Sequence, residues 1–240
     1  MGLPIPFPSD GLIQQKTNIG HARTLWIPNS FDYDVFQDKF WGDAILTLYP
    51  AAKTNGTSAA VTFTEHNAYG YLEFVTGTDD NGYAGQGMGL QFKGDRGVLA
   101  EFLVTTPATI TTLKFEVGLS DADDDAGAIN LKTTPTLTAT DTAVFVVDTD
   151  DDANIAFVTA KAGTATATQD IVALAASTTY RFAVRVEGDS VSGYINGKLV
   201  GSGTIEGGNA LTPWMFCQAR AGTASRTMVL NKWRCIQPAY

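Results

Sequence analysis

Charged residues, histidine and cysteine are all scarce in this chain of 240 residues. Aspartate, glutamate, lysine and arginine make up 17% of the sequence, and there are two histidines and two cysteines. The H-E-x-x-H zinc motif and the G-x-S-x-G nucleophile elbow are both absent. The residues therefore indicate neither a zinc hydrolase nor a serine hydrolase.

Positive charge and long apolar runs are also lacking. Sixteen Lys and Arg residues stand against 25 Asp and Glu residues, which gives a net charge of -9 at pH 7. A nucleic-acid backbone would be repelled, so we expect no nucleic-acid partner. No apolar run approaches the roughly eighteen residues of a membrane span, and Pro4, Pro6 and Pro8 interrupt the start of the chain. We expect neither a membrane partner nor a secretory signal.

The two cysteines are too few for a disulfide framework. Cys217 and Cys235 fall in two consecutive strand-like runs, which we expect to pair as a hairpin with its turn near residues 221–225. That register separates the two thiols along the strands, too far for a disulfide. We predict free, buried thiols in a protein made in a reducing cytoplasm.

Glycine, proline and short apolar runs are abundant by contrast. The chain has 24 Gly and 9 Pro, and turn residues separate its apolar runs, which indicates strands. Residues 113–119 alternate most strictly, so Lys114 and Glu116 are expected on a solvated face. The less strict runs 98–104 and 143–147 are expected to be covered on both faces.

Two consecutive hairpins are predicted in the C-terminal half. The pairs 188–189 and 196–197 suit two-residue turns. Following the register through both turns places six apolar residues on one face: Phe182, Val184, Val186, Val191, Ile195 and Val200. Tyr194 falls on the opposite face, near Arg181 and Arg185.

Residues 1–35 show no sustained strand or helix period and are predicted to form an extended arm. Leu3, Ile5 and Phe7 alternate with prolines, an arrangement suited to lying along another surface. A frayed terminus is the alternative. Six aromatic residues crowd positions 26–41, and we expect these rings to plug one end of a sheet core.

Four segments resemble the concanavalin A-like, laminin-G-like jelly roll. In order they are ITTLKFEVGLSDADD, AVFVVDTDDDANIAFVTAKAGTAT, TTYRFAVRVEGDSVSGYINGKLVGSG and LTPWMFCQARAGTASRTMVLNKWRCI. The resemblance implies an all-β fold, a two-sheet antiparallel jelly-roll sandwich over residues 36–240. More narrowly, the order of segments is similar to jelly-roll proteins among tailed-phage structural proteins, which implies a virion component such as a head decoration protein.

Glucanases that share this jelly roll carry an E-x-D-x-x-E strand motif, which is absent here. No two glutamates lie within seven positions of each other; they are Glu65, Glu73, Glu101, Glu116, Glu187 and Glu206. We therefore expect no catalytic residues and a protein that is not an enzyme.

Two acidic runs, 121–125 and 148–152, each end a predicted strand. Clustered carboxylates suit calcium, and the laminin-G resemblance implies calcium at a sheet rim, with Asp121 and Asp123 as the candidate ligands. The alternative is two solvated loops that keep the surface soluble. No other metal or cofactor is expected.

The first functional hypothesis is a non-enzymatic capsid decoration protein on the virion surface, made in the host cytoplasm. Its arm would bury four apolar side chains on the major capsid protein or another virion protein: Leu3, Ile5, Phe7 and Trp26. A homo-oligomer is expected, with a trimer as the specific guess. The alternative is a carbohydrate-binding module that recognises host glycan through Tyr194, Arg181 and Arg185.

Overall fold

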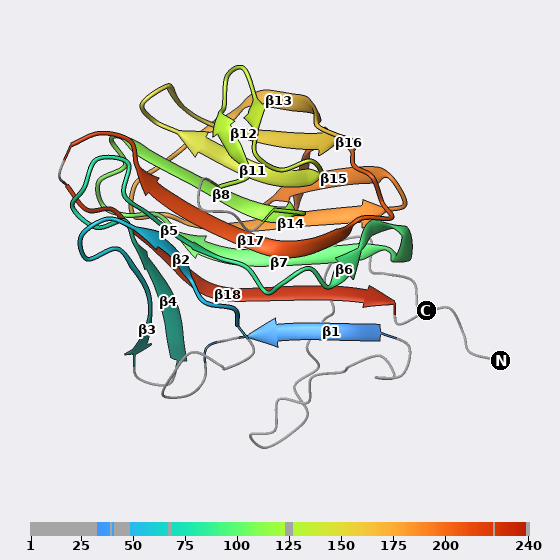
Figure 1. Ribbon diagram of the computed structural model, residues 1–240, viewed down its shortest axis with the longest axis horizontal. Coiled ribbons are helices and arrows are strands. Elements are labelled where there is room, and N and C mark those ends of the chain that lie inside the picture. The colour runs from blue at the N-terminus through green and yellow to red at the C-terminus, as the bar shows by residue number, and fades with distance from the viewer. Residues whose placement is uncertain are drawn as a thin grey trace.

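The computed structural model describes residues 33–38, 40, 49–66, 69–122, 127–222 and 224–238. In this part of the chain, two eight-stranded antiparallel sheets form a β-sandwich (Figure 1). The predicted all-β jelly-roll fold is confirmed. A short 3-10 helix, η1 (Gly94–Arg96), leads into β7.

We call the first sheet sheet A. Its strands are, in spatial order, β16 (Lys198–Thr204), β15 (Ser190–Ile195), β14 (Thr179–Glu187), β7 (Val98–Thr105), β18 (Thr227–Pro238), β4 (Tyr69–Val75) and β3 (Ala60–His66). An eighth strand, β1 (Tyr33–Asp38), pairs with β18 beside the main path.

The second sheet is sheet B. Its spatial order is β13 (Thr164–Ala173), β12 (Asp152–Lys161), β11 (Thr142–Asp148), β8 (Leu113–Ser120), β17 (Ala210–Ala219), β5 (Tyr83–Gln86) and β2 (Lys53–Asn55). Here β6 (Phe92–Lys93) pairs with β17. In Figure 1, β12, β13 and β16 lie at the top of the molecule and β1 lies at the bottom.

One apolar core fills the space between the sheets, because each strand turns alternate side chains inward. The ring of Phe145 on β11 lies 5.0 Å from that of Phe182 on β14 and 4.7 Å from that of Phe157 on β12. The six residues predicted to share a face of the two hairpins all reach this core, Val200 from its margin. The predicted hairpin register is confirmed.

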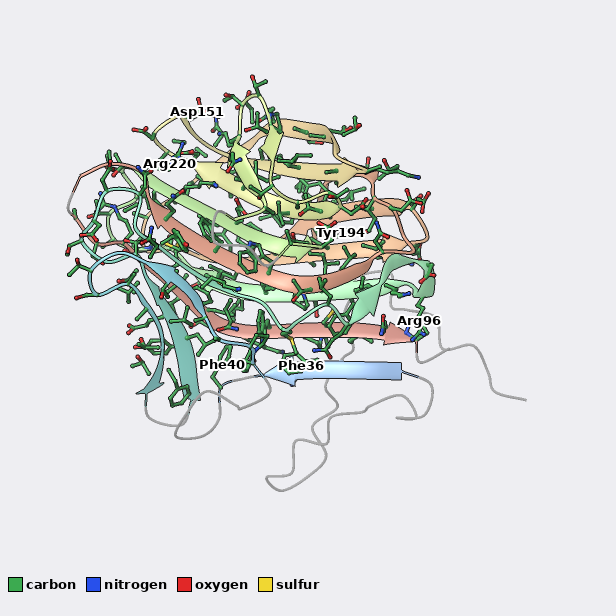
Figure 2. All side chains as sticks on the ribbon, viewed as in Figure 1. Phe36, Phe40, Arg96, Asp151, Tyr194 and Arg220 are labelled. Atoms are coloured by element: carbon green, nitrogen blue, oxygen red, sulfur yellow. The ribbon has the colours of Figure 1, made fainter. Side chains whose placement is uncertain are left out.

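Of the six aromatic residues predicted to plug one end of the core, the structure describes the side chains of two, Phe36 and Phe40, and both pack against the core. The Phe36 ring lies 5.9 Å from that of Tyr49 and 6.0 Å from that of Trp233, and Tyr49 stacks on Trp233 at 5.4 Å. Phe40 is also buried. Figure 2 labels Phe36 on β1 and Phe40 just past the end of that strand.

The predicted hairpin between the strands that carry the two cysteines was wrong. β17 pairs with β8 and β5 in sheet B, whereas β18 pairs with β7 and β4 in sheet A. The chain therefore changes sheets after Ala219. Both Cys217 and Cys235 are free and buried, as predicted.

A further layer covers the outer face of sheet B. It runs from residue 127 to residue 139 and contains the short pair β9 (Ile129–Leu131) and β10 (Thr136–Leu137). We call residues 127–139 the outer layer. Its apolar side chains pack on those of sheet B in a second cluster that includes Ala128, Ile129, Ala139, Val144, Val146, Val158, Trp214 and Phe216.

This outer layer overturns one prediction from the alternation of residues 113–119. The face expected to be solvated is buried: Lys114 is 1% exposed and Glu116 is fully buried. The predicted burial of both faces of residues 143–147 is confirmed, since every residue of β11 is buried.

The predicted arm residues Leu3, Ile5, Phe7 and Trp26 lie outside the described residues. β1 begins at Tyr33, two residues before the predicted end of the arm. Among the described residues, none forms a helix with the length and apolar character needed to cross a membrane.

Candidate functional site

The outer face of sheet A carries a row of three side chains across β14, β15 and β16. Tyr194 lies directly opposite Ala183 on one neighbouring strand and opposite Leu199 on the other. Leu199 is 55% exposed, which is unusual for a large apolar side chain, and Tyr194 is half-buried. We call Ala183, Tyr194 and Leu199 the platform.

Tyr194 points outward because of strand alternation. Its neighbour Ile195 enters the core, and so do Phe182 and Val184 on either side of Ala183. The two-residue turn at residues 196–197 sets Leu199 opposite Tyr194, and a bulge shifts the pairing with β16 only beyond that pair, from Gly193 onward. Figure 2 labels Tyr194 on the ribbon.

Two arginines flank the platform along β14. Arg181 and Arg185 lie two residues to either side of Ala183, on the same face as Tyr194. Their side chains are 29% and 41% exposed, so both are partly open to solvent. The structure thus brings together Tyr194, Arg181 and Arg185, the three residues predicted from the sequence to form a glycan site.

Each of these arginines forms an ion pair with a glutamate. Arg181 pairs with Glu101 on β7, and Arg185 pairs with Glu187 on its own strand. Glu101 also pairs with Arg234 on β18, and burial lowers the pKa of Arg234. A guanidinium group carries five N–H donors, and the ion pair of Arg181 uses its Nη2 group.

The platform combines the contacts that a sugar needs. A pyranose ring has an apolar C–H face and a polar rim, so it can stack on an aromatic ring while its hydroxyls accept hydrogen bonds from nearby donors. Here the apolar row supplies the first surface, and Arg181 and Arg185 supply donors on both sides of it.

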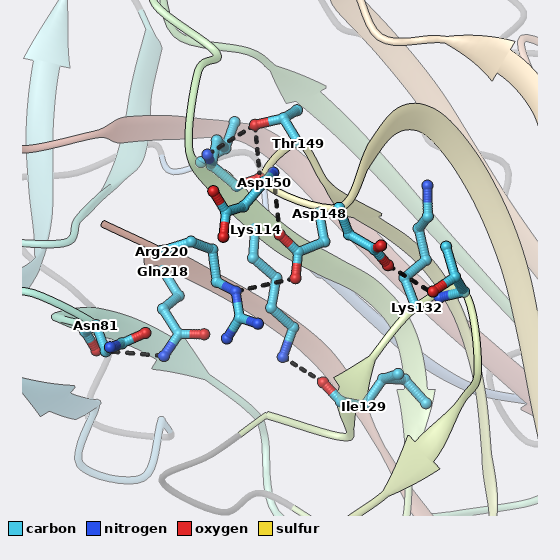
Figure 3. Close-up of polar contacts among 12 residues, drawn as sticks. Asn81, Lys114, Ile129, Lys132, Asp148, Thr149, Asp150, Gln218 and Arg220 are labelled. Carbon is cyan, nitrogen blue, oxygen red and sulfur yellow. Dashed lines mark hydrogen bonds and ion pairs between the residues drawn. The ribbon is translucent and has the colours of Figure 1, made fainter. Parts of the chain in front are cut away.

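A second polar cluster lies beneath the outer layer on sheet B. The Glu116 carboxylate accepts hydrogen bonds from the backbone N–H of Ala128 at 2.6 Å, from that of Ile129 at 3.0 Å and from Trp214 Nε1 at 3.2 Å. Lys114 Nζ lies 3.0 Å from the same carboxylate and donates to the Ile129 carbonyl (Figure 3). These contacts fasten the outer layer to β8.

Asp148 extends this cluster toward the end of the sheet, where Figure 3 shows its contact with Arg220. Arg220 Nε lies 2.9 Å from Asp148 Oδ2. Burial raises the pKa of Asp148, and the charge of Arg220 opposes that rise. Glu116 on β8 lies opposite Val146 on β11, two residues from Asp148. Glu116 and Asp148 therefore lie on the same face of sheet B, on neighbouring strands. The sequence did not reveal this, because the two residues are far apart in the chain.

The first predicted calcium ligand is engaged within the protein. Asp121 Oδ1 accepts the backbone N–H of Thr140 at 3.0 Å, and burial raises the pKa of Asp121, although backbone hydrogen bonds with Asp141 and Thr140 oppose that rise. The second, Asp123, lies outside the described residues. Within the described ranges, no group of three or more His, Cys, Asp or Glu residues could hold a metal ion. Calcium binding stays a prediction.

Comparison with known proteins identifies the fold. No family model and no curated protein matches the sequence. A protein of unknown function from Shewanella oneidensis MR-1 is similar in structure, with a TM-score of 0.58 and 18% identity over 86% of this chain and 87% of that one. The carbohydrate recognition domain of Emp47p has a TM-score of 0.57 and 7% identity, over 86% and 97%. A β-glucanase from Bacillus licheniformis has a TM-score of 0.54 and 11% identity, over 83% and 96%.

The β-glucanase corrects one prediction. The absence of an E-x-D-x-x-E motif led us to expect that the chain is not an enzyme, and that exclusion was wrong, because enzymes are among the structures that share this fold. None of the three structures compared is named as a virion protein, so the capsid role, its partners and its location stay predictions. At these identities the likeness shows the fold alone, which is a concanavalin A-like jelly roll.

Proposed function

We propose that this protein binds a glycan through the platform on the outer face of sheet A. One observation carries the proposal: a half-buried tyrosine and a largely exposed leucine lie side by side on the outer face of sheet A, next to two arginine side chains of β14. The naming of one similar structure as a carbohydrate recognition domain supports it.

The binding mechanism follows from the strand geometry. Ala183 is small, so the Tyr194 ring stands clear of its neighbour on β14 and can offer a face to a sugar ring. Arg181 and Arg185 would donate hydrogen bonds to hydroxyl or acidic groups on the rim of that ring. Since the ion pair with the buried Glu101 already restricts the Arg181 side chain, less conformational entropy is lost there on binding.

The test is a glycan array on the full chain, followed by calorimetry with each glycan that binds. Tyr194→Ala should weaken binding by at least about tenfold, the loss expected for a stacking contact of about 1.4 kcal/mol. Arg185→Gln should also weaken binding. Release of reducing ends should be recorded on the same glycans, because the fold is shared with a glucanase.

Tyr71 provides a matched control. It is another half-buried tyrosine on the outer face of sheet A, but it lies on β4, on the far side of β7 and β18. Tyr71→Ala should leave affinity unchanged. The proposal fails if no glycan binds, or if Tyr194→Ala and Tyr71→Ala bind equally well.

A further inference from the structure

β13 is the longest of the four strands that end the two sheet paths. It has ten residues, against seven in β16, seven in β3 and three in β2. An end strand presents main-chain groups that its own sheet does not use, and proteins commonly guard such an edge with lysine, proline or a bulge. The first five residues of β13, Thr164 to Thr168, contain no lysine, proline or bulge.

The hairpin turn fixes which main-chain groups of β13 face outward. Ala162 and Gly163 both have positive φ, at 48° and 77°, and form a two-residue turn between β12 and β13. The flanking residues of such a turn, Lys161 and Thr164, form a hydrogen-bonded pair, and the pattern then alternates. The N–H and C=O groups of Ala165 and Ala167 therefore point away from β12, to the edge with which no other described strand pairs.

This run suits pairing with itself. Residues 164–169 contain no charged side chain, although the whole chain has a net charge of -9 that opposes contact between copies at most surfaces. The run ends at Asp170, where a positive φ of 54° accompanies the register shift between β13 and β12. The edge that could pair with another strand is therefore short and uncharged, and it ends at Asp170.

We propose that β13 pairs antiparallel with β13 of a second copy, about a twofold axis at Thr166. Ala165 of one copy then faces Ala167 of the other, and each such pair exchanges both main-chain hydrogen bonds. Thr164 faces Thr168, and the two Thr166 side chains meet at the axis, a cross-strand pairing that sheets favour. Sheet B becomes continuous through both copies.

Sedimentation equilibrium on the full chain, over a range of concentrations, tests this interface. The unmodified protein should dimerise. Thr166 is exposed, so Thr166→Lys should fold normally while placing like charges opposite each other at the axis. Its dimer should be at least about tenfold weaker. Thr166→Asp should have the same effect for the same reason.

Mixing the two variants separates loss of the interface from loss of the fold. Thr166→Lys and Thr166→Asp place opposite charges at the axis, so an equimolar mixture should form a mixed dimer. The variant Ser202→Lys, at an exposed position on β16, an end strand of sheet A, should dimerise like the unmodified protein. A monomeric unmodified protein, a dimer indifferent to Thr166→Lys, or a mixture that stays monomeric would overturn the proposal.

Discussion

At the scale of single residues, Lys132 shows how the structure tolerates a charge away from water. Its side chain is fully buried, and Nζ donates to the carbonyls of Asp152 and Asn154, both at 2.9 Å, and to Asp152 Oδ2 at 2.6 Å. A buried ammonium group is costly without a counter-charge. The hydrogen bond from Lys132 lowers the pKa of Asp152.

Asp152→Asn should therefore lower the free energy of unfolding by about 2–4 kcal/mol at pH 7, because it leaves a buried cation without its partner. The folded-state pKa of Asp152 lies below its ordinary value of 3.8, so the stabilisation is complete well above pH 3.8 and is lost as pH falls through the lowered pKa. Denaturant unfolding at pH 7 and at about pH 2.5 measures this.

The gap between the two proteins should shrink in acid. Asp150→Asn, an exposed neighbour in the same run, should change stability little at either pH. A gap that stays equal at both pH values would contradict the pKa argument.

At the scale of strands, two glycines explain how closely the sheets approach beneath the platform. A Cβ on Gly193 of β15 would lie 2.9 Å from three ring atoms of Phe157, and one on Gly201 of β16 would lie 2.8 Å from the same ring. Phe157 comes from β12, in the opposite sheet. The absence of two side chains therefore makes room for one aromatic ring.

Gly193→Ala should destabilise the protein by about 1–3 kcal/mol, since an added methyl group overpacks a filled space. Gly208→Ala is the control, because a Cβ at Gly208 meets nothing within 4 Å. Thermal unfolding of both variants gives the comparison. Equal midpoints for the two variants would show that the Phe157 ring can move aside at no cost.

The hairpins β14 to β16 were predictable from the sequence because two-residue turns set the register locally. That register also placed Tyr194 beside Arg181 and Arg185. The burial of Lys114 and Glu116 was not predictable, because alternation describes one strand and says nothing of a distant segment packed over it. Because both side chains are charged, we expected them to be exposed to water. In the structure, backbone groups of the outer layer take the place of water as their hydrogen-bond partners.

At the scale of the whole molecule, the reactivity of the two cysteines shows whether the two sheets stay packed together. Cys217 enters the core from sheet B and Cys235 enters it from sheet A. Burial raises the pKa of both thiols. The thiolate is the form of cysteine that reacts with thiol reagents. Both cysteines should therefore be unreactive in the folded protein, because reagents cannot reach them and because they stay protonated.

A thiol reagent should therefore label neither cysteine in the native protein and both after unfolding. Labelling under mildly denaturing conditions should follow the rate of global unfolding, measured in parallel by tryptophan fluorescence. Rapid modification of either thiol in buffer would mean that one sheet opens locally.

The outer layer also has a consequence for the order of events during synthesis. Its docking surface combines residues made just after it, such as Val144 and Val158, with Trp214 and Phe216 of β17, which leave the ribosome much later. Until β17 has been added beside β8, the outer layer has only part of its final surface. A nascent chain must therefore carry this apolar segment incompletely covered over the synthesis of some eighty further residues.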